Sequence, residues 1–86
     1  MAYVYAEIKS RLFSEENQRK FLAVRDQAHY LLRLAGAARM QEILHKVSGD
    51  SWENMAMVDR LVELGELREI PDPGAPGQHR LFVNIQ

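Results

Sequence analysis

The spacing of apolar residues changes at Gly65, and this change most constrains the fold. Before Gly65, apolar side chains recur at the intervals of a helix with one buried face, at Val58, Leu61 and Val62. After it, residues 71–77 are rich in proline and glycine, and residues 80–85 have a strand period that places Leu81, Val83 and Ile85 on one side. We therefore expect a helix that ends at Gly65 and, over residues 66–86, a β-hairpin with a long tip.

The start of that helix carries a capping signal. Asp50 stands three residues before Glu53, which is the spacing of a capping box. In such a box the first side chain accepts from the helix N-terminus and the acid reaches back to the cap. We expect this helix to begin at about Ser51, with Met55 and Met57 at the margins of its buried face.

Two further helical stretches precede it. Ser14 is a good cap, and apolar positions follow at helical spacing until Gly36, so the first helix should span residues 14–35. A shorter amphipathic stretch contains Met40, Ile43, Leu44 and Val47 and stops at Ser48–Gly49. Together with the helix that ends at Gly65, it defines a helix-turn-helix over residues 37–65. Residues 1–13 lack a clean period and are compatible with a strand, a helix or an arm that packs on a partner.

Length and composition favour one domain. A chain of 86 residues, 47% of them hydrophobic, buries one modest core, so we assign residues 1–86 to a single domain. Stability is marginal at this size, and a homodimer formed through the N-terminal arm and the first helix would add burial. No apolar run is long enough to span a membrane, and residues 1–13 carry charges unlike a signal peptide. The chain contains no cysteine, so we expect a cytoplasmic protein.

Charge is distributed unevenly along the chain. Residues 1–47 contain eight lysine and arginine residues against five acids and are net +3. Residues 48–86 contain three arginines against seven acids and are net −4. The second half, which contains the last helix and the hairpin, is therefore acidic in sequence.

The order of these elements resembles the winged helix-turn-helix superfamily of small bacterial regulators. The resemblance is carried by Val58-Asp59-Arg60-Leu61-Val62-Glu63-Leu64-Gly65-Glu66-Leu67 and by the hairpin with its Gly/Pro tip. It implies a mainly α fold, with three helices and a small C-terminal β-hairpin as the wing. It covers about two-thirds of the chain, and many functions use this scaffold.

The resemblance implies a DNA-binding transcriptional regulator. In that mode the third helix enters the major groove and the wing touches the backbone. The residues available for nucleic-acid contact are Ser51, Arg60, Gln78, His79 and Arg80.

The charge of the third helix supports an alternative function. A helical projection places Trp52, Glu53, Ala56, Asp59, Arg60 and Glu63 on its outward face, which is acidic. Because DNA affinity depends on lysine and arginine, this face suits a protein partner instead. The partner-binding residues would then be Trp52, Glu53, Ala56, Asp59 and Glu63. Trp52 also has a structural interpretation, as a ring packed over the helix-turn corner.

Catalysis finds no support in the sequence. Nucleophile motifs, phosphate-binding glycine loops and paired acids at catalytic spacing are missing. His29, His45 and His79 lie far apart and lack carboxylates at metal-ligand spacing, so we expect surface histidines. We therefore expect a non-catalytic binding module without a cofactor or metal.

Overall fold

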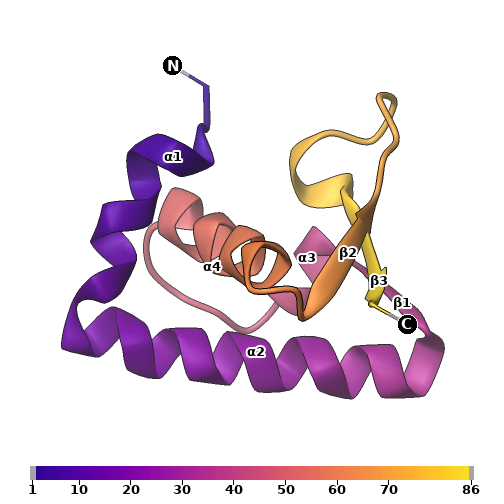
Figure 1. The fold of residues 1–86 in the computed structure, drawn as a ribbon, viewed down its shortest axis with the longest axis horizontal. Coiled ribbons are helices and arrows are strands. Elements are labelled where there is room, and N and C mark those ends of the chain that lie inside the picture. The colour runs from indigo at the N-terminus through magenta and orange to yellow at the C-terminus, as the bar shows by residue number, and fades with distance from the viewer. Residues whose placement is uncertain (1, 86) are drawn as a thin grey trace.

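The computed structural model describes residues 2–85, which form a mainly helical fold with one small sheet (Figure 1). Met1 and Gln86, the ends of the predicted arm and hairpin, lie outside the described residues. In chain order the elements are α1 (Tyr5–Ile8), the 3-10 helix η1 (Lys9–Phe13), α2 (Glu15–Ala35), β1 (Ala37–Arg39), α3 (Met40–Ile43), α4 (Ser51–Glu63), β2 (Leu67–Ile70), the 3-10 helix η2 (Gly77–His79) and β3 (Leu81–Asn84).

The long helix α2 confirms the predicted first helix. The Ser14 hydroxyl oxygen accepts a hydrogen bond from the Asn17 backbone N–H at 3.2 Å, which satisfies one of the free donors at the helix start. Gly36 ends the helix in the left-handed conformation, with φ of +79°, and its N–H donates to the Leu32 carbonyl. Val24, Ala28 and Leu32 line the buried side of α2, as their spacing predicts.

Helix α4 begins at Ser51 as predicted, but its capping box is only half formed. The Asp50 carboxylate accepts from the backbone N–H groups of Trp52 and Glu53, at 2.8 and 3.1 Å. The Glu53 carboxylate instead accepts a hydrogen bond from the Asn17 side-chain amide of α2 at 3.2 Å. Glu53 therefore ties α4 to α2, because a tertiary donor lies within its reach.

The sheet has three strands, one more than the predicted hairpin. Its order is β1-β3-β2, with both pairs antiparallel, so β3 is central. Phe82 of β3 stands between Ala38 of β1 and Glu69 of β2, and its side chain is fully buried. The sequence did not reveal β1, because three residues, Ala-Ala-Arg, are too few to show a strand period. The helix predicted after Gly36 is shortened accordingly, to the four residues of α3.

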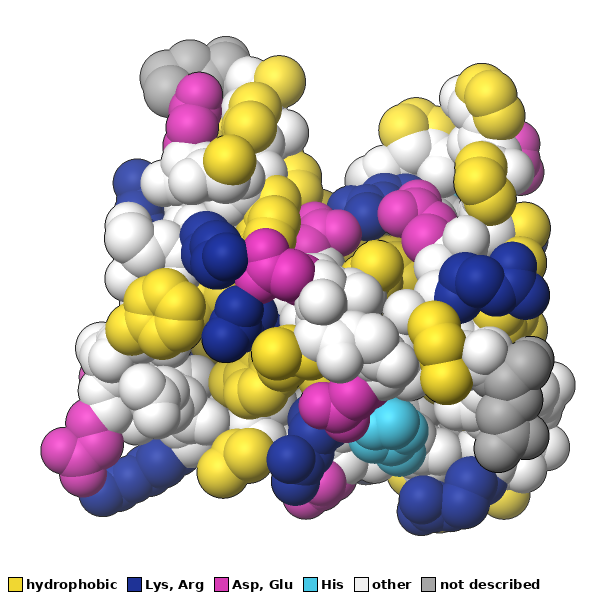
Figure 2. Space-filling view, in the orientation of Figure 1, with side chains coloured by type: hydrophobic (Ala, Val, Ile, Leu, Met, Phe, Trp, Pro, Cys, Tyr) yellow, Lys and Arg dark blue, Asp and Glu magenta, His cyan; other side chains and the backbone are white. Residues whose placement is uncertain are grey.

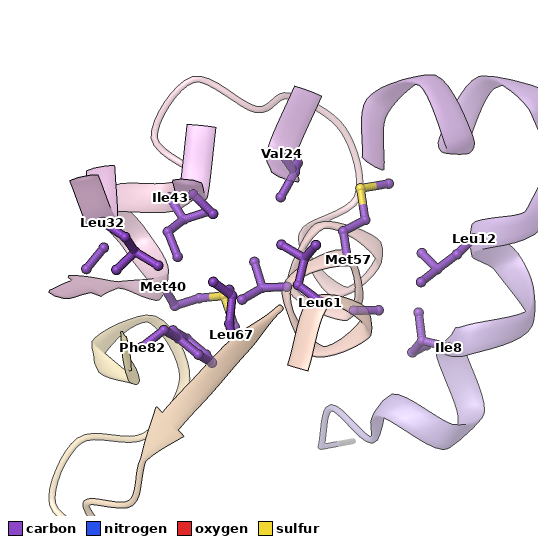
Figure 3. Packing of buried hydrophobic residues seen from close by; sticks show 14 residues of the cluster. Ile8, Leu12, Val24, Leu32, Met40, Ile43, Met57, Leu61, Leu67 and Phe82 are labelled. Carbon is purple, nitrogen blue, oxygen red and sulfur yellow. The ribbon is translucent and has the colours of Figure 1, made fainter. Parts of the chain in front are cut away.

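The core lies between α2, α4, the sheet and the first two short helices (Figure 3). Met40, Ile43, Met57, Leu61 and Phe82 are fully buried at its centre. Met57 was predicted at the margin of the buried face of α4, and this prediction is wrong because α4 is covered on a second side. None of the helices in residues 2–85 is both long and apolar enough to span a membrane.

Candidate functional site

Residues 2–13, here called the N-terminal segment, cover α4 on the side away from α2 and the sheet. The sequence left its conformation open, and it forms α1 and η1, which pack along α4 (Figure 1). Ile8 and Leu12 point from this segment into the core, where they are 2% and 3% exposed (Figure 3). The segment is therefore part of the folded domain and covers the face of α4 that the helical projection had left outward.

Polar contacts join the same two elements above the apolar layer. The Tyr3 hydroxyl donates to Asp59 Oδ2 at 2.5 Å, and the Tyr5 hydroxyl donates to Glu63 Oε1 at 3.1 Å. Lys9 Nζ lies 2.8 Å from Glu63 Oε2. Two acids of α4 are thus used by side chains of the N-terminal segment.

Glu63 is surrounded by donors. Besides the hydrogen bonds from Lys9 and Tyr5, Glu63 accepts one from Arg60 Nη1 at 2.5 Å. The Arg60 guanidinium also lies 5.5 Å from the centre of the Phe13 ring. Hydrogen bonds from Lys9 and Arg60 lower the pKa of Glu63 to about 2. Burial, and then the hydrogen bond to Glu63, raise the pKa of Tyr5 to about 12. Glu63 is consequently ionised over the whole neutral and weakly acidic range.

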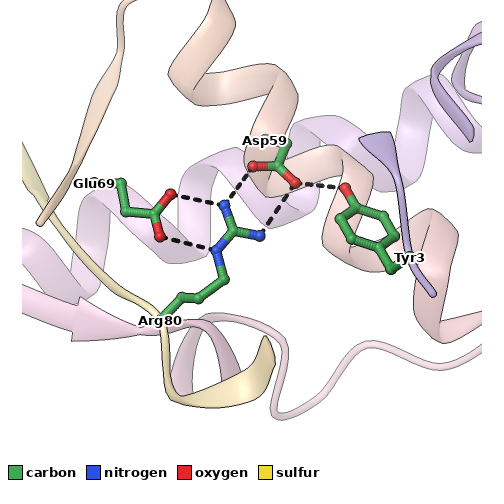
Figure 4. A network of polar contacts seen from close by, with 4 residues as sticks. All are labelled: Tyr3, Asp59, Glu69 and Arg80. Carbon is green, nitrogen blue, oxygen red and sulfur yellow. Dashed lines mark hydrogen bonds and ion pairs between the residues drawn. The ribbon is translucent and has the colours of Figure 1, made fainter. Parts of the chain in front are cut away.

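A second polar network centres on Arg80 (Figure 4). Its guanidinium donates to Glu69 through Nε and Nη2, at 3.0 and 2.8 Å, and to Asp59 through Nη2 and Nη1, at 2.7 and 3.3 Å. The side chains of Arg80, Asp59 and Glu69 are 18%, 13% and 32% exposed. The hydrogen bonds to Glu69 and Asp59 raise the pKa of Arg80, and burial raises the pKa of Tyr3. The network links the β2–β3 hairpin to α4 and, through Tyr3, to the N-terminal segment.

These pairs change the charge of the predicted acidic face. Asp59, Glu63 and Glu69 are matched by Lys9, Arg60 and Arg80. Figure 2 shows a notch between the N-terminal segment and the loop between β2 and β3, with acidic and basic side chains side by side along its floor. The floor of this notch is therefore close to electrical neutrality.

The five residues predicted to contact nucleic acid lie in different surroundings. Ser51, Gln78 and His79 are exposed, whereas Arg60 and Arg80 hold carboxylates of their own chain. Gln78 lines a polar hollow of about 610 Å³ between α2 and α3, together with Gln27, Leu31, Gln41, Glu42, Leu44 and His45. Arg60 instead lines a different hollow next to η1, so the structure does not bring these two residues to one place.

The residues predicted for a protein partner are mostly covered. Ala56 is fully buried, so its predicted outward position is wrong; the N-terminal segment covers α4 on the side where the projection expected solvent. Trp52 is partly buried and meets the Tyr3 ring edge to face, with the ring centres 6.4 Å apart, so its ring packs against the N-terminal segment. Of the five residues, only Glu63 is exposed; Glu53 and Asp59 are half-buried.

Asn54 is a buried polar residue that the sequence analysis missed. It is 4% exposed, and its amide nitrogen donates to the carbonyl oxygens of Val47 and Ser48, at 3.4 and 3.2 Å. These bonds hold the turn between α3 and α4. Its position among apolar residues of α4, at Met57, Val58 and Leu61, is the only signal in the sequence that places it on the buried face.

An apolar hollow lies where η1, α2 and the end of α4 meet. It has a volume of about 300 Å³ and is lined by Leu12, Phe13, Gln18, Phe21, Leu22, Arg60 and Leu64. Phe13, Leu22 and Leu64 are 52%, 47% and 48% exposed. Hydrophobic side chains are visible on this face in Figure 2, between the N-terminal segment and α2. The apolar hollow is therefore a surface at which three large side chains remain uncovered together.

The histidines do not form a metal site within residues 2–85. His29 Nε2 lies 2.8 Å from Glu66 Oε1 and links α2 to the entry of β2, while His45 and His79 are exposed. Among the described residues, no group of three or more histidines, cysteines and acids is placed to hold a metal ion. His29 is thus a structural contact between two elements.

These features describe a mainly helical domain with a small three-stranded antiparallel sheet. No protein-family model, curated protein or solved structure matches the chain.

Proposed function

We propose that the chain is a non-catalytic winged helix-turn-helix module that binds a protein through the apolar hollow. The element order supports the winged-helix part: α2, β1, α3, α4, β2 and β3 follow one another, with α3 and α4 as the helix-turn-helix and β2–β3 as the wing. The cysteine-free sequence supports a cytoplasmic location.

The packing of the N-terminal segment over α4 is the observation that favours a protein over DNA as the partner. A groove-reading helix must present its outer face to the bases and nearby cations to the phosphates. Here the N-terminal segment packs along that face, where the Tyr3 hydroxyl donates to Asp59 and Lys9 donates to Glu63. The two nearest arginines, Arg60 and Arg80, are paired with acids. Groove entry by α4 would require the N-terminal segment to leave the core.

The apolar hollow has the chemistry of a protein interface. The centres of such interfaces are apolar, rich in aromatic residues and depleted of unpaired charge. Phe13, Leu22 and Leu64 supply large apolar side chains, and the charge of Arg60 at its edge is held by Glu63. This surface replaces the acidic face of α4 as the proposed docking site.

A comparison of variants tests this proposal. The immobilised chain should capture a protein partner, and Leu64→Glu should abolish capture because a carboxylate would be placed in the apolar hollow. Ile85→Glu is the matched control, since Ile85 is similarly exposed, at 53%, but lies outside the hollow. Equal capture by wild type and Leu64→Glu would overturn the proposed surface. Duplex DNA that binds at low salt and is released by added salt would overturn the choice of partner.

The second candidate function, a DNA-binding transcriptional regulator, is favoured by one observation. Gln78 and His79 of the wing are exposed and lie against α3, and Arg39 Nη1 donates to the His79 carbonyl at 2.6 Å. DNA contact would then use the α3–η2 side, with Ser51 at the start of α4 as a further contact. Lys46 is exposed and follows α3 in the chain. Under this candidate, Lys46→Glu should weaken duplex binding and reduce its salt dependence; unchanged binding would remove the candidate.

A further inference from the structure

The exposed side of α2 extends the apolar hollow. Val24, Ala28 and Leu32 face the core, so the opposite side of the helix faces solvent. Its apolar members Leu22, Tyr30 and Leu34 are 47%, 50% and 68% exposed. Exposed charged residues of both signs occur along the same helix: Glu15, Arg19, Asp26 and Arg33. A helix of 21 residues offers about 31 Å of such surface, which is long enough for a helix-to-helix interface.

We infer that the protein bound at this surface is a second copy of the chain, with the two α2 helices packed antiparallel around a twofold axis between Leu22 and Ala23. This inference rests on the proposed function and names its partner. A closed twofold dimer is the commonest assembly of soluble proteins, and it requires a surface that complements itself. Additional burial would also stabilise a chain of only 86 residues.

The charges of α2 complement themselves in this arrangement. Arg19 lies three residues before Leu22, and Asp26 lies three residues after Ala23. Antiparallel pairing about the axis therefore places Arg19 opposite Asp26 of the second copy, and the symmetry repeats the pair. A parallel pairing would place like charges together at both positions. Within one chain the partners of these groups are themselves exposed: Arg19 lies 2.8 Å from Glu15, and Asp26 lies 3.5 Å from Arg25. With Arg19 and Asp26 78% and 75% exposed, these surface pairs contribute little.

The same axis would bring exposed apolar residues of the two copies together. A group close to a twofold axis is close to its own symmetry mate, so Leu22 and the adjoining apolar hollow would meet the hollow of the second copy. Leu64 lines that hollow beside Leu22 and would be covered with it. Phe13 lines the same hollow and would be covered with Leu22, while Tyr30 and Leu34 lie further along the exposed side of α2. The interface would thus cover Phe13, Leu22, Tyr30, Leu34 and Leu64, five of the seven large hydrophobic side chains exposed in residues 2–85.

A charge-exchange experiment on the purified full-length chain tests the pairing. Sedimentation velocity should show a dimer for wild type and for the control Ile85→Glu. Arg19→Glu and Asp26→Lys should each dissociate it, because each single change places two like pairs in the interface. Mixed in equal amounts, the two variants should form a heterodimer, and one chain carrying both changes should dimerise alone. Failure of the mixture and of the double variant to associate, with wild type dimeric, would overturn the antiparallel arrangement.

The absence of cysteine permits a second, geometric test. Ala23→Cys lies beside the axis and should give a covalent dimer on mild oxidation. Arg33→Cys, ten residues further along α2, would be about 15 Å from the axis and about 30 Å from its mate, and should not cross-link. Efficient cross-linking of Arg33→Cys without that of Ala23→Cys would refute the position of the axis.

Leu22→Glu separates this inference from the proposed function. It should raise the dimer dissociation constant at least about tenfold, since it buries an uncompensated carboxylate near the axis, with the helical circular dichroism signal of the monomer retained. A wild-type chain that is monomeric at all concentrations, yet captures another protein in a manner lost in Leu64→Glu, would refute the second copy and leave the proposed function standing. A monomer that captures no protein would refute both.

Discussion

Replacing Arg80 by methionine should destabilise the fold strongly, because it leaves the carboxylates of Asp59 and Glu69 without a cation. The intact ion pairs are themselves not the main source of stability, since taking charged groups out of water costs free energy. Methionine keeps an unbranched side chain but removes the guanidinium, which lies 5.4 Å from the centre of the Phe82 ring. It removes four hydrogen bonds to Asp59 and Glu69. The two carboxylates would then face each other without a cation between them.

The burial of the three side chains sets the magnitude. Pairs on the surface contribute about 0–1 kcal/mol, whereas removing one partner of a buried pair costs about 3–5 kcal/mol. With exposures of 18%, 13% and 32%, the Arg80, Asp59 and Glu69 side chains lie nearer the buried limit. We expect Arg80→Met to lower the free energy of unfolding by about 2–4 kcal/mol and the melting temperature by about 10–20 °C.

Urea unfolding followed by circular dichroism measures this change. The control is the triple variant Arg80→Met/Asp59→Asn/Glu69→Gln, which removes the abandoned charges as well. It should recover most of the lost free energy, because the cost arises from carboxylates left unpaired in a partly buried site. If the triple variant is as unstable as Arg80→Met alone, charge is not the cause and the lost packing against Phe82 explains the effect.

Three further predictions concern the N-terminal segment and the caps. The pKa of Glu63 is lowered to about 2, from an ordinary value near 4.5, so its contribution to stability should persist above pH 4.5 and disappear as the pH falls towards 2. Glu63→Gln should flatten that part of an acid-unfolding curve, and an unchanged curve would contradict the hydrogen bonds that Glu63 accepts from Lys9 and Arg60. The pKa of Tyr5 is raised to about 12, so the stabilisation it provides should be complete below pH 10 and lost between pH 10 and 12; Tyr5→Phe should shift the alkaline transition seen by phenolate absorbance, and no shift would count against the contact with Glu63. Asp50→Ala should cost about 1 kcal/mol of unfolding free energy through loss of the α4 cap, whereas Glu53→Gln, whose contact is with Asn17, should cost less; the reverse order would argue for a complete capping box.

The sequence predicted best those elements whose signals are local. Ser14, Gly36 and Asp50 act at helix ends through backbone geometry and hydrogen bonds to near neighbours, so α2 and the start of α4 were predicted within a residue. The hairpin was likewise readable from alternation and from the Pro/Gly tip. Strand β1 and the shortness of α3 were not, because Ala-Ala-Arg becomes a strand only when β3 lies beside it.

The candidate site was harder to predict because it depends on contacts distant in sequence. Tyr3 meets Asp59, and Lys9 meets Glu63, across more than fifty residues of chain. A helical projection of α4 alone assigns its uncovered side to solvent and cannot include a segment whose own conformation has no clear period. The projection therefore placed Ala56 outward, whereas its small side chain is fully buried where the N-terminal segment covers α4.

The same long-range contacts alter what charge says about a partner. A count along the chain assigns net −4 to residues 48–86, which favours a basic partner for that half. In space, Lys9 from the other half and Arg60 and Arg80 from the same half hold three of those acids, Asp59, Glu63 and Glu69. Paired charges attract a basic protein weakly, and paired arginines attract phosphate weakly. A partner at this end of α4 is therefore selected by shape and apolar contact. The surface that should be tested for the proposed function consists of the uncovered Phe13, Leu22 and Leu64, beside the alternating charges of α2.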